Sequence, residues 1–256
     1  MNFMNNKNLF LLSEIVKRNF AAKYKDSKLG LLWSFIKPLL IMILLTIIFS
    51  TVFGANIENY PVYLLAGKCI YDFFSAGTTI SMLSLRNNQN ILKKTPAPKY
   101  IFVLGSVFSE FINYLITLLI LVAVMIVTKS SFYFNTMFFS VIPIVSLLIF
   151  MVGLGLILSV FCVYYKDIEH LWGVVTMMGM YACAIFFPMN IIPEPFYSYM
   201  ILNPLYWIID QFRLLFVYGT FPNLLNIINS LLFSAIIFVL GIIIFKKYGK
   251  KVAMKF

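Results

Sequence analysis

The chain has 256 residues, of which 62% are hydrophobic and only 11% are charged, and its formal net charge is +11. One soluble core cannot bury that much apolar surface, so the composition excludes a soluble globular protein and predicts an all-α polytopic membrane protein. The positive charge does not indicate a nucleic-acid partner, because the basic residues cluster between apolar runs of about 20 residues.

Residues 1–28 are predicted to form a basic amphipathic helix on the cytoplasmic membrane surface. Leu12, Val16, Phe20 and Tyr24 recur at helical spacing, while the charged residues fall mostly on the other side. The cations would face anionic headgroups. Charges interrupt the first apolar stretch and no small-residue cleavage site follows it, which argues against a removable signal peptide. The residues predicted to contact headgroups are Arg18, Lys23, Tyr24, Lys25 and Trp33.

The rest of the chain, residues 29–256, is predicted to be one transmembrane domain with six spanning helices. A polar turn, YYKDIEH at 164–170, separates the fourth span from the fifth. Most of the 20 lysines and arginines fall on the side that holds both termini, so the positive-inside rule predicts that both ends are cytoplasmic. The apolar runs cover about residues 31–53, 62–85, 100–127, 137–163, 171–187 and 224–245.

The apolar stretch at 188–222 is not an ordinary crossing, because prolines interrupt it repeatedly. We predict two re-entrant helices that enter the outer leaflet and return, since non-helical backbone at membrane depth requires cover by protein or water. An outside loop with two interfacial helices is the alternative. In the second helix Asn203 would be the N-cap, Pro204 the first helical residue, and Asp210 would pair with Arg213.

Three charged residues fall well inside predicted spans, where a charge is costly and should face the protein interior or water. Lys68 and Asp72 are four residues apart, and we expect them to neutralise each other on one helix face. Glu110 has no partner nearby in the sequence. It could bind a cation from another helix or line a conduit.

Several kinds of chemistry have no sequence signal. No GxxxxGK[ST] motif occurs, so the chain lacks the loop that cradles ATP phosphates. Cys69, Cys162 and Cys183 share no CxxC spacing, which argues against a disulfide framework or a zinc site. His170 is the only histidine, and no further ligands are evident beside it. We therefore expect no catalytic residue, cofactor or metal in this chain.

Five stretches of the sequence resemble segments of one known family. In chain order they are KYKDSKLGLLWSFIKPLL, RNNQNILKKTPAPKY, SEFINY, YYKDIEH, and IIPEPF followed by NPLYWIIDQFR. They are similar to segments of the type-2 ABC exporter permeases that move lipid-linked O-antigen, capsule or teichoic acid polysaccharides. The sequence departs from the family pattern in the charged stretch GKCIYDFF and at Ala184, where a proline is common.

The resemblance implies a permease of the bacterial cytoplasmic (inner) membrane that exports an undecaprenyl-linked polysaccharide. It would form a homodimer and bind two nucleotide-binding ATPase subunits, which would hold ATP and Mg. The loop after the second span would couple to the ATPase, although its charge alone is equally compatible with a solvated loop. The predicted coupling residues are Arg86, Lys93, Lys94, Pro96 and Lys99.

Aromatic rings can stack on the apolar faces of sugars, so several of them are candidates for the translocation path. Drug or small-lipid export by the same fold, a membrane enzyme acting on a polyprenyl-linked glycan, and an ATP-independent channel or scaffold are the alternative functions. An enzyme would need clustered acidic metal ligands or a His/Arg phosphatase set, which one histidine and nine acidic residues do not suggest. The path candidates are Tyr71, Phe73, Phe74, Glu110, Tyr114, Tyr181, Phe186 and Phe187.

Overall fold

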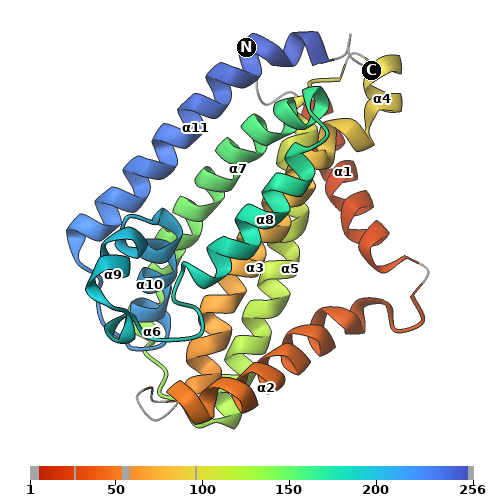
Figure 1. Cartoon of the computed structure of the whole chain (residues 1–256). Coiled ribbons are helices and arrows are strands. Elements are labelled where there is room, and N and C mark those ends of the chain that lie inside the picture. Colours follow the sequence, from red (N-terminus) through yellow and green to blue (C-terminus); the bar gives the residue numbers. More distant parts are fainter. Residues whose placement is uncertain (1–5, 26, 54–56, 58, 96, 253–256) are drawn as a thin grey trace.

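The computed structural model describes residues 6–25, 27–53, 57, 59–95 and 97–252, and all regular structure within them is helical (Figure 1). Figure 1 shows α4 and the end of α11 at one end of the bundle, and α6, α9 and α10 at the other. The helices are α1 (Asn6–Tyr24), α2 (Trp33–Phe53), α3 (Tyr60–Asn87), α4 (Gln89–Lys94), α5 (Tyr100–Val127), α6 (Phe134–Met137), α7 (Val141–Tyr164), α8 (Ile168–Tyr181), α9 (Glu194–Ile201), α10 (Pro204–Phe216) and α11 (Leu224–Val252).

Helix α3 is the centre of the bundle and packs against both α5 and α7, while α11 packs against α7. The α7–α11 pair depends on glycine. A Cβ atom on Gly153 of α7 would lie 2.7 Å from the backbone nitrogen of Phe238 in α11, and one on Gly241 would lie 3.0 Å from Cα of Gly153. Small residues at such a crossing let two backbones approach closely, which stabilises helix pairs inside a membrane.

Four helical stretches in the described residues are long and apolar enough to cross a membrane: Gly30–Ser50, Tyr100–Val127, Phe134–Tyr164 and Leu224–Gly249. They correspond to the first, third, fourth and sixth predicted runs, and they support a polytopic membrane protein. Helix α3 covers the second run but is more polar, because it contains charged residues. That all six runs cross the membrane stays a prediction.

The fifth predicted run, 171–187, is wrong beyond Tyr181, where α8 ends. With 14 residues, α8 is about 21 Å long. It is therefore shorter than the hydrocarbon core of about 30 Å. Residues 182–187 lie outside a helix, and side chains of α3, of α10 and of its N-cap Asn203 bind five of their six carbonyl groups.

The predicted N-terminal helix is present as α1, and it packs against α5. Within the described part of α1, Ile15 is the one buried residue, and it was not among the apolar positions predicted from the sequence. It packs against Gly105 of α5, where an added Cβ atom would lie 3.0 Å from the Cβ atom of Ile15. The helix is thus held by protein as well as by the amphipathic pattern of its sequence. Its position along a membrane surface stays a prediction.

Candidate functional site

The last turn of α1 is tied to α5 by a group of polar side chains. Nζ of Lys23 lies 2.9 Å from Oε2 of Glu110, whose residue is only 4% exposed. Tyr24 donates to Oδ1 of Asn113 at 2.7 Å, and the Asn113 amide donates to Glu110 at 3.2 Å. Of the two possibilities for Glu110, a cation from another helix is the one found here. A motion of α1 would therefore be transmitted directly to α5.

A polar cavity of about 230 Å³ lies between α1, α3 and α5, next to this contact. Arg18 is the one charged residue among its lining side chains, and one of its guanidinium nitrogens donates to Oδ1 of Asn88 at 2.6 Å. The amide of Asn88 in turn donates to the carbonyl of Ser84 at 2.7 Å. The other lining residues are Asn19, Ile80, Asn87 and Ser106. The guanidinium group of Arg18 thus gives this cavity a positive charge among neutral polar side chains.

The predicted coupling residues divide into two sets in the structure. Lys93 and Lys94 are exposed at the end of α4. Nη1 of Arg86 lies 2.9 Å from Oε2 of Glu169 in α8, and Nζ of Lys99 donates to the carbonyl of Gly249 in α11 at 2.7 Å. Burial lowers the pKa of Lys99 from its ordinary value. Arg86 and Lys99 thus hold helices together, whereas Lys93 and Lys94 face outward.

Pro96, the remaining residue of the predicted coupling set, lies outside the described residues. Lys25, which directly follows α1, and Trp33, the first residue of α2, are both exposed. Their predicted contact with headgroups stays a prediction, as does the coupling role of the α4 region.

The segment 182–187 after α8 has its carbonyl groups bound by side chains. Ala184 has φ 48°, a left-handed conformation that interrupts the helix. Arg213 donates to the carbonyl of Ala184 at 2.9 Å and to that of Ile185 at 3.0 Å. Tyr60 donates to Phe186 at 2.8 Å, and Asn203 to Ala182 at 3.2 Å. Backbone outside a helix can lie within a membrane bundle only when it is satisfied in this way.

Helix α10 begins as predicted. Asn203 is its N-cap, with its side-chain oxygen accepting from Leu205 N at 3.1 Å, and Pro204 is the first helical residue. The predicted Asp210–Arg213 pair is wrong: no ion pair joins these two described residues. Arg213 is 4% exposed, and its Cζ lies 3.6 Å from the centroid of the Tyr63 ring. The guanidinium group donates instead to the hydroxyl of Tyr63 and to the carbonyls of Ala184 and Ile185.

Most of the aromatic path candidates lie in the core of the bundle. Phe73 stacks on Tyr114 with ring centroids 5.0 Å apart, and Phe74 stacks on Phe150 at 5.7 Å. The hydroxyl of Tyr71 donates to the carbonyl of Thr176 in α8. In this arrangement these rings stabilise the bundle, and a place along a path stays a prediction.

The other candidates lie near the end of α8. Tyr181 is 52% exposed, and its ring centroid lies 5.6 Å from that of the buried Phe186. Phe186 also stacks on Phe49 of α2 at 5.3 Å. Phe187 is half-buried, and its carbonyl accepts from Tyr63 at 3.0 Å. Of this set, Tyr181 is the ring that faces outward.

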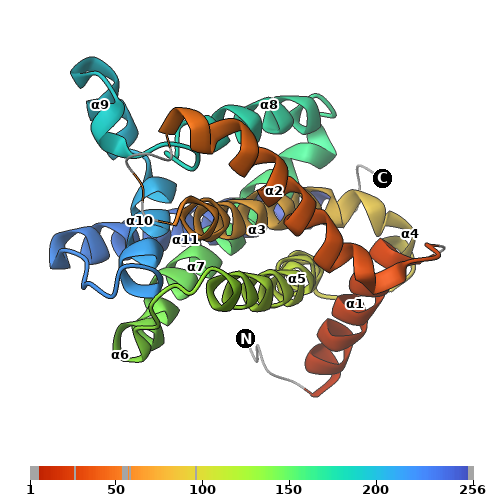
Figure 2. The same ribbon diagram turned by 90° about the horizontal axis from the view of Figure 1, so that it is seen from below.

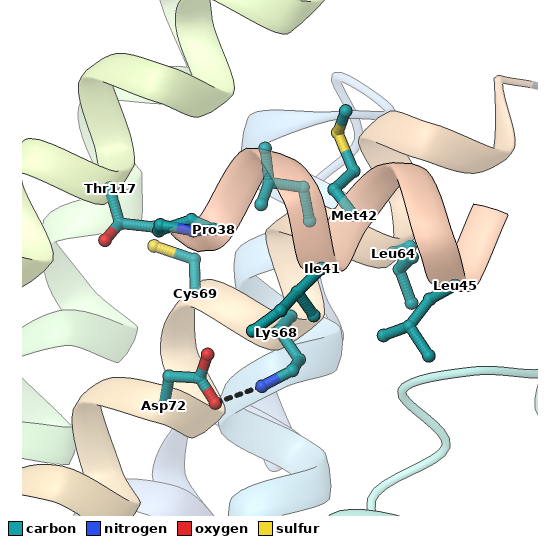
Figure 3. A pocket seen from close by; sticks show the side chains of 10 residues that line it. Pro38, Ile41, Met42, Leu45, Leu64, Lys68, Cys69, Asp72 and Thr117 are labelled. Atoms are coloured by element: carbon teal, nitrogen blue, oxygen red, sulfur yellow. Dashed lines mark hydrogen bonds and ion pairs between the residues drawn. The ribbon is translucent and has the colours of Figure 1, made fainter. Parts of the chain in front are cut away.

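Lys68 and Asp72 form the predicted ion pair on one face of α3 (Figure 3). Figure 3 shows Ile41 of α2 beside Lys68, while Pro38 and Met42 line the same small space. The remaining space there is about 10 Å³. Within the described residues, no group of three or more His, Cys, Asp and Glu side chains could hold a metal ion.

A bundle of long apolar helices with an amphipathic helix docked on one of them defines a polytopic helical membrane protein. The sequence pattern of the family described as ABC-2 type transporter matches residues 11–217. The chain therefore belongs to the ABC-2 type transporter family.

Three relatives illustrate the similarity. The chain is 31% identical over 238 residues to the O-antigen export system permease protein RfbA of Klebsiella pneumoniae, covering 93% of this chain and 91% of the relative. A protein of the same name from Myxococcus xanthus is 24% identical over 215 residues, or 83% and 82% of the two chains. The polysialic acid transport protein KpsM of Escherichia coli is 24% identical over 200 residues, 77% of each chain.

Proposed function

We propose that this chain is the permease subunit of an ATP-driven exporter of a polyprenyl-linked polysaccharide of the O-antigen, capsule or teichoic acid type. The observation that carries the proposal is its similarity, over nine tenths of both chains, to a protein named as an O-antigen export permease. The subunit works as a homodimer with two nucleotide-binding ATPase subunits in the bacterial inner membrane. ATP and Mg are bound by the ATPase, because this sequence has no phosphate-binding loop.

The end of the bundle that carries α4 faces the cytoplasm and receives the ATPase. Its basic residues satisfy the positive-inside rule, and α11 ends on this side (Figure 1). The exposed Lys93 and Lys94 dock on an acidic cleft of the partner. The short 188–222 helices then lie at the outer end and enter the outer leaflet.

The energy of ATP binding moves α1 and α4, which are the parts of the chain nearest the partner. The contacts of Lys23 and Tyr24 transmit the motion of α1 to α5. Helix α2 packs on α3 and α5 through partly buried side chains such as Met42, Leu45 and Phe49, while its other face is exposed. It parts from α8 so that the polymer can thread outward between two copies.

The cavity beside Arg18 receives the diphosphate of the polyprenyl carrier. Its lining is mainly polar, it contains a guanidinium group, and its volume of about 230 Å³ accommodates two phosphate groups. Arginine is well suited to phosphate because its fixed fork of donors matches the phosphate oxygens.

The test is co-purification of the chain with its ATPase in nanodiscs, followed by ATP hydrolysis with and without an undecaprenyl-linked glycan. A 2:2 complex whose hydrolysis rises with the glycan is expected. The double change Lys93→Glu and Lys94→Glu should abolish co-purification. Lys129→Glu is the control, because it reverses one exposed lysine at the end of the bundle opposite α4. It should leave the complex intact.

The same experiment separates the alternatives. A 2:2 complex stimulated by a small lipid or a drug but not by the glycan would establish a transporter of a different cargo. A chain that binds no ATPase would contradict the ATP-driven mechanism altogether.

A further inference from the structure

Helix α3 is mostly enclosed, apart from the residues that face the cavity beside Arg18, such as Ile80 and Asn87, and apart from one polar line on another face. Steps of three and four residues connect positions that are half-buried or exposed, while nearly every other residue between them is buried. Such steps place residues on one face of a helix. We call this line the α3 stripe, and it consists of Lys68, Asp72, Ser75, Thr79, Leu83 and Arg86.

The α3 stripe is polar in the part of the bundle where neighbouring spans are apolar. Five of its six side chains carry a hydroxyl or a charge. The side chain of Asp72 is 53% exposed, although it lies 15 residues from the cytoplasmic end of α3 at Asn87. These residues are also why α3 is more polar than the helices around it.

Two helices flank the stripe: α2 covers most of the Lys68 side chain, which is 15% exposed, but the Asp72 side chain stays 53% exposed. Helix α2 packs over the Lys68 side, and α8 packs on the other side, where the Trp172 indole donates to Thr78 at 3.2 Å. Figure 2 shows α8 and much of α2 on the side of α3 that faces away from α5 and α7. Helix α8 has no buried residue. The stripe is therefore the polar floor between two exposed apolar helices.

Lipid cannot be the neighbour of this surface. A charged side chain facing hydrocarbon is strongly unfavourable, and intramembrane ionisable residues face the protein interior or a water-filled space. We propose that the α3 stripe lines an aqueous translocation path, and that its hydroxyl groups and balanced charges contact a hydroxyl-rich chain as it passes. The contact with such a chain rests on the proposed function, whereas the aqueous lining does not.

The charge of the stripe suits an uncharged polymer. Lys68 is neutralised by Asp72, and Arg86 by Glu169 of α8. The groups that remain, Ser75 and Thr79, are hydroxyls that can exchange hydrogen bonds with sugar hydroxyls and with water. Strong electrostatic attraction would hold the polymer in place. A conduit must release it, so balanced charges and hydroxyl groups suit this role.

Thiol labelling tests the aqueous lining in the assembled complex with its ATPase in membrane vesicles. Ser75→Cys and Thr79→Cys are treated with a charged, membrane-impermeant methanethiosulfonate. Leu115→Cys is the control, because Leu115 is 43% exposed on α5, 15 residues from the cytoplasmic end of that helix at Tyr100. The native Cys69, Cys162 and Cys183 are buried, and the unmodified chain gives the background.

The stripe cysteines are expected to react at least tenfold faster than Leu115→Cys. Equal rates would overturn the aqueous lining, whether the stripe meets lipid or a dry protein surface. The glycan that stimulates ATP hydrolysis is then added, and it is expected to slow labelling at both stripe positions. Stimulated hydrolysis with unchanged labelling would overturn the contact with the polymer while leaving the proposed export function intact.

Discussion

Lys23 of α1 and Glu110 of α5 form an ion pair in which Nζ lies 2.9 Å from Oε2, and Glu110 is almost fully buried. The two residues are 87 positions apart. The pair connects the amphipathic helix, which would receive the push of the ATPase, with a helix of the transmembrane bundle. It is therefore the contact through which we expect cytoplasmic motion to reach the membrane domain.

Replacing Glu110 by Gln should lower the stability of the bundle by about 1–3 kcal/mol, because the ammonium group of Lys23 then loses the carboxylate with which it forms an ion pair. The measurement is thermal unfolding of the purified chain in nanodiscs. The charge swap Lys23→Glu with Glu110→Lys should recover part of the loss. A Glu110→Gln protein as stable as the wild type would show that the pair does not hold α1.

Arg213 should not be replaceable by lysine. Its guanidinium group donates hydrogen bonds to Tyr63 Oη at 2.9 Å and to the carbonyls of Ala184 and Ile185. A lysine cannot reproduce this planar fork of donors. Arg213→Lys is expected to cost about 2–4 kcal/mol, since buried acceptors lose their donors.

Asp210→Asn is the matched control for Arg213→Lys, because the structure has no ion pair between Asp210 and Arg213. It should change the unfolding temperature far less than Arg213→Lys does. Equal losses in the two variants would indicate that the acid and the base act as a pair.

The glycine contact between α7 and α11 gives a steric prediction. A methyl group on Gly241 would meet the backbone oxygen of Gly153 at 2.5 Å. Gly241→Ala should therefore lower stability by about 1–3 kcal/mol, as overpacking does. Gly173 of α8 has nothing within 4 Å of such a methyl group. Gly173→Ala should be neutral or stabilising by about 0.5–1 kcal/mol, because alanine is the better helix former. Identical unfolding curves for the two variants would contradict the close crossing.

Arg18→Gln should raise the glycan concentration that half-stimulates ATP hydrolysis by about tenfold, the effect of losing about 1.4 kcal/mol from one charge-assisted contact. The maximal rate should stay unchanged, because the cavity binds the carrier and does not take part in hydrolysis. Lys17→Gln is the control: Lys17 is a neighbouring cation whose side chain is 73% exposed and pairs with Glu14. An equal shift in both variants would mean that general surface charge, and not the cavity, attracts the carrier.

Much of the secondary structure could be predicted from the sequence. The run at 100–127 coincides with α5, and the Asn203-Pro204 dipeptide begins α10 as expected. The Lys68–Asp72 pair was also predictable, since residues four apart on a helix are neighbours. These features depend on local spacing, which the order of the residues alone determines.

The tertiary structure decided which distant groups meet. It placed Lys23 at Glu110, joined Arg213 to the carbonyls of Ala184 and Ile185 instead of in an ion pair with Asp210, and bound the carbonyls that follow the end of α8 at Tyr181. It also left one polar line of α3 uncovered, which hydropathy could register only as a weaker span. The sequence by itself determined a polytopic helical membrane protein and the extent of most of its helices, because length and periodicity are properties of neighbouring residues. Ion pairs, carbonyl caps and exposed faces depend on how the helices pack, because they join residues that the chain keeps far apart.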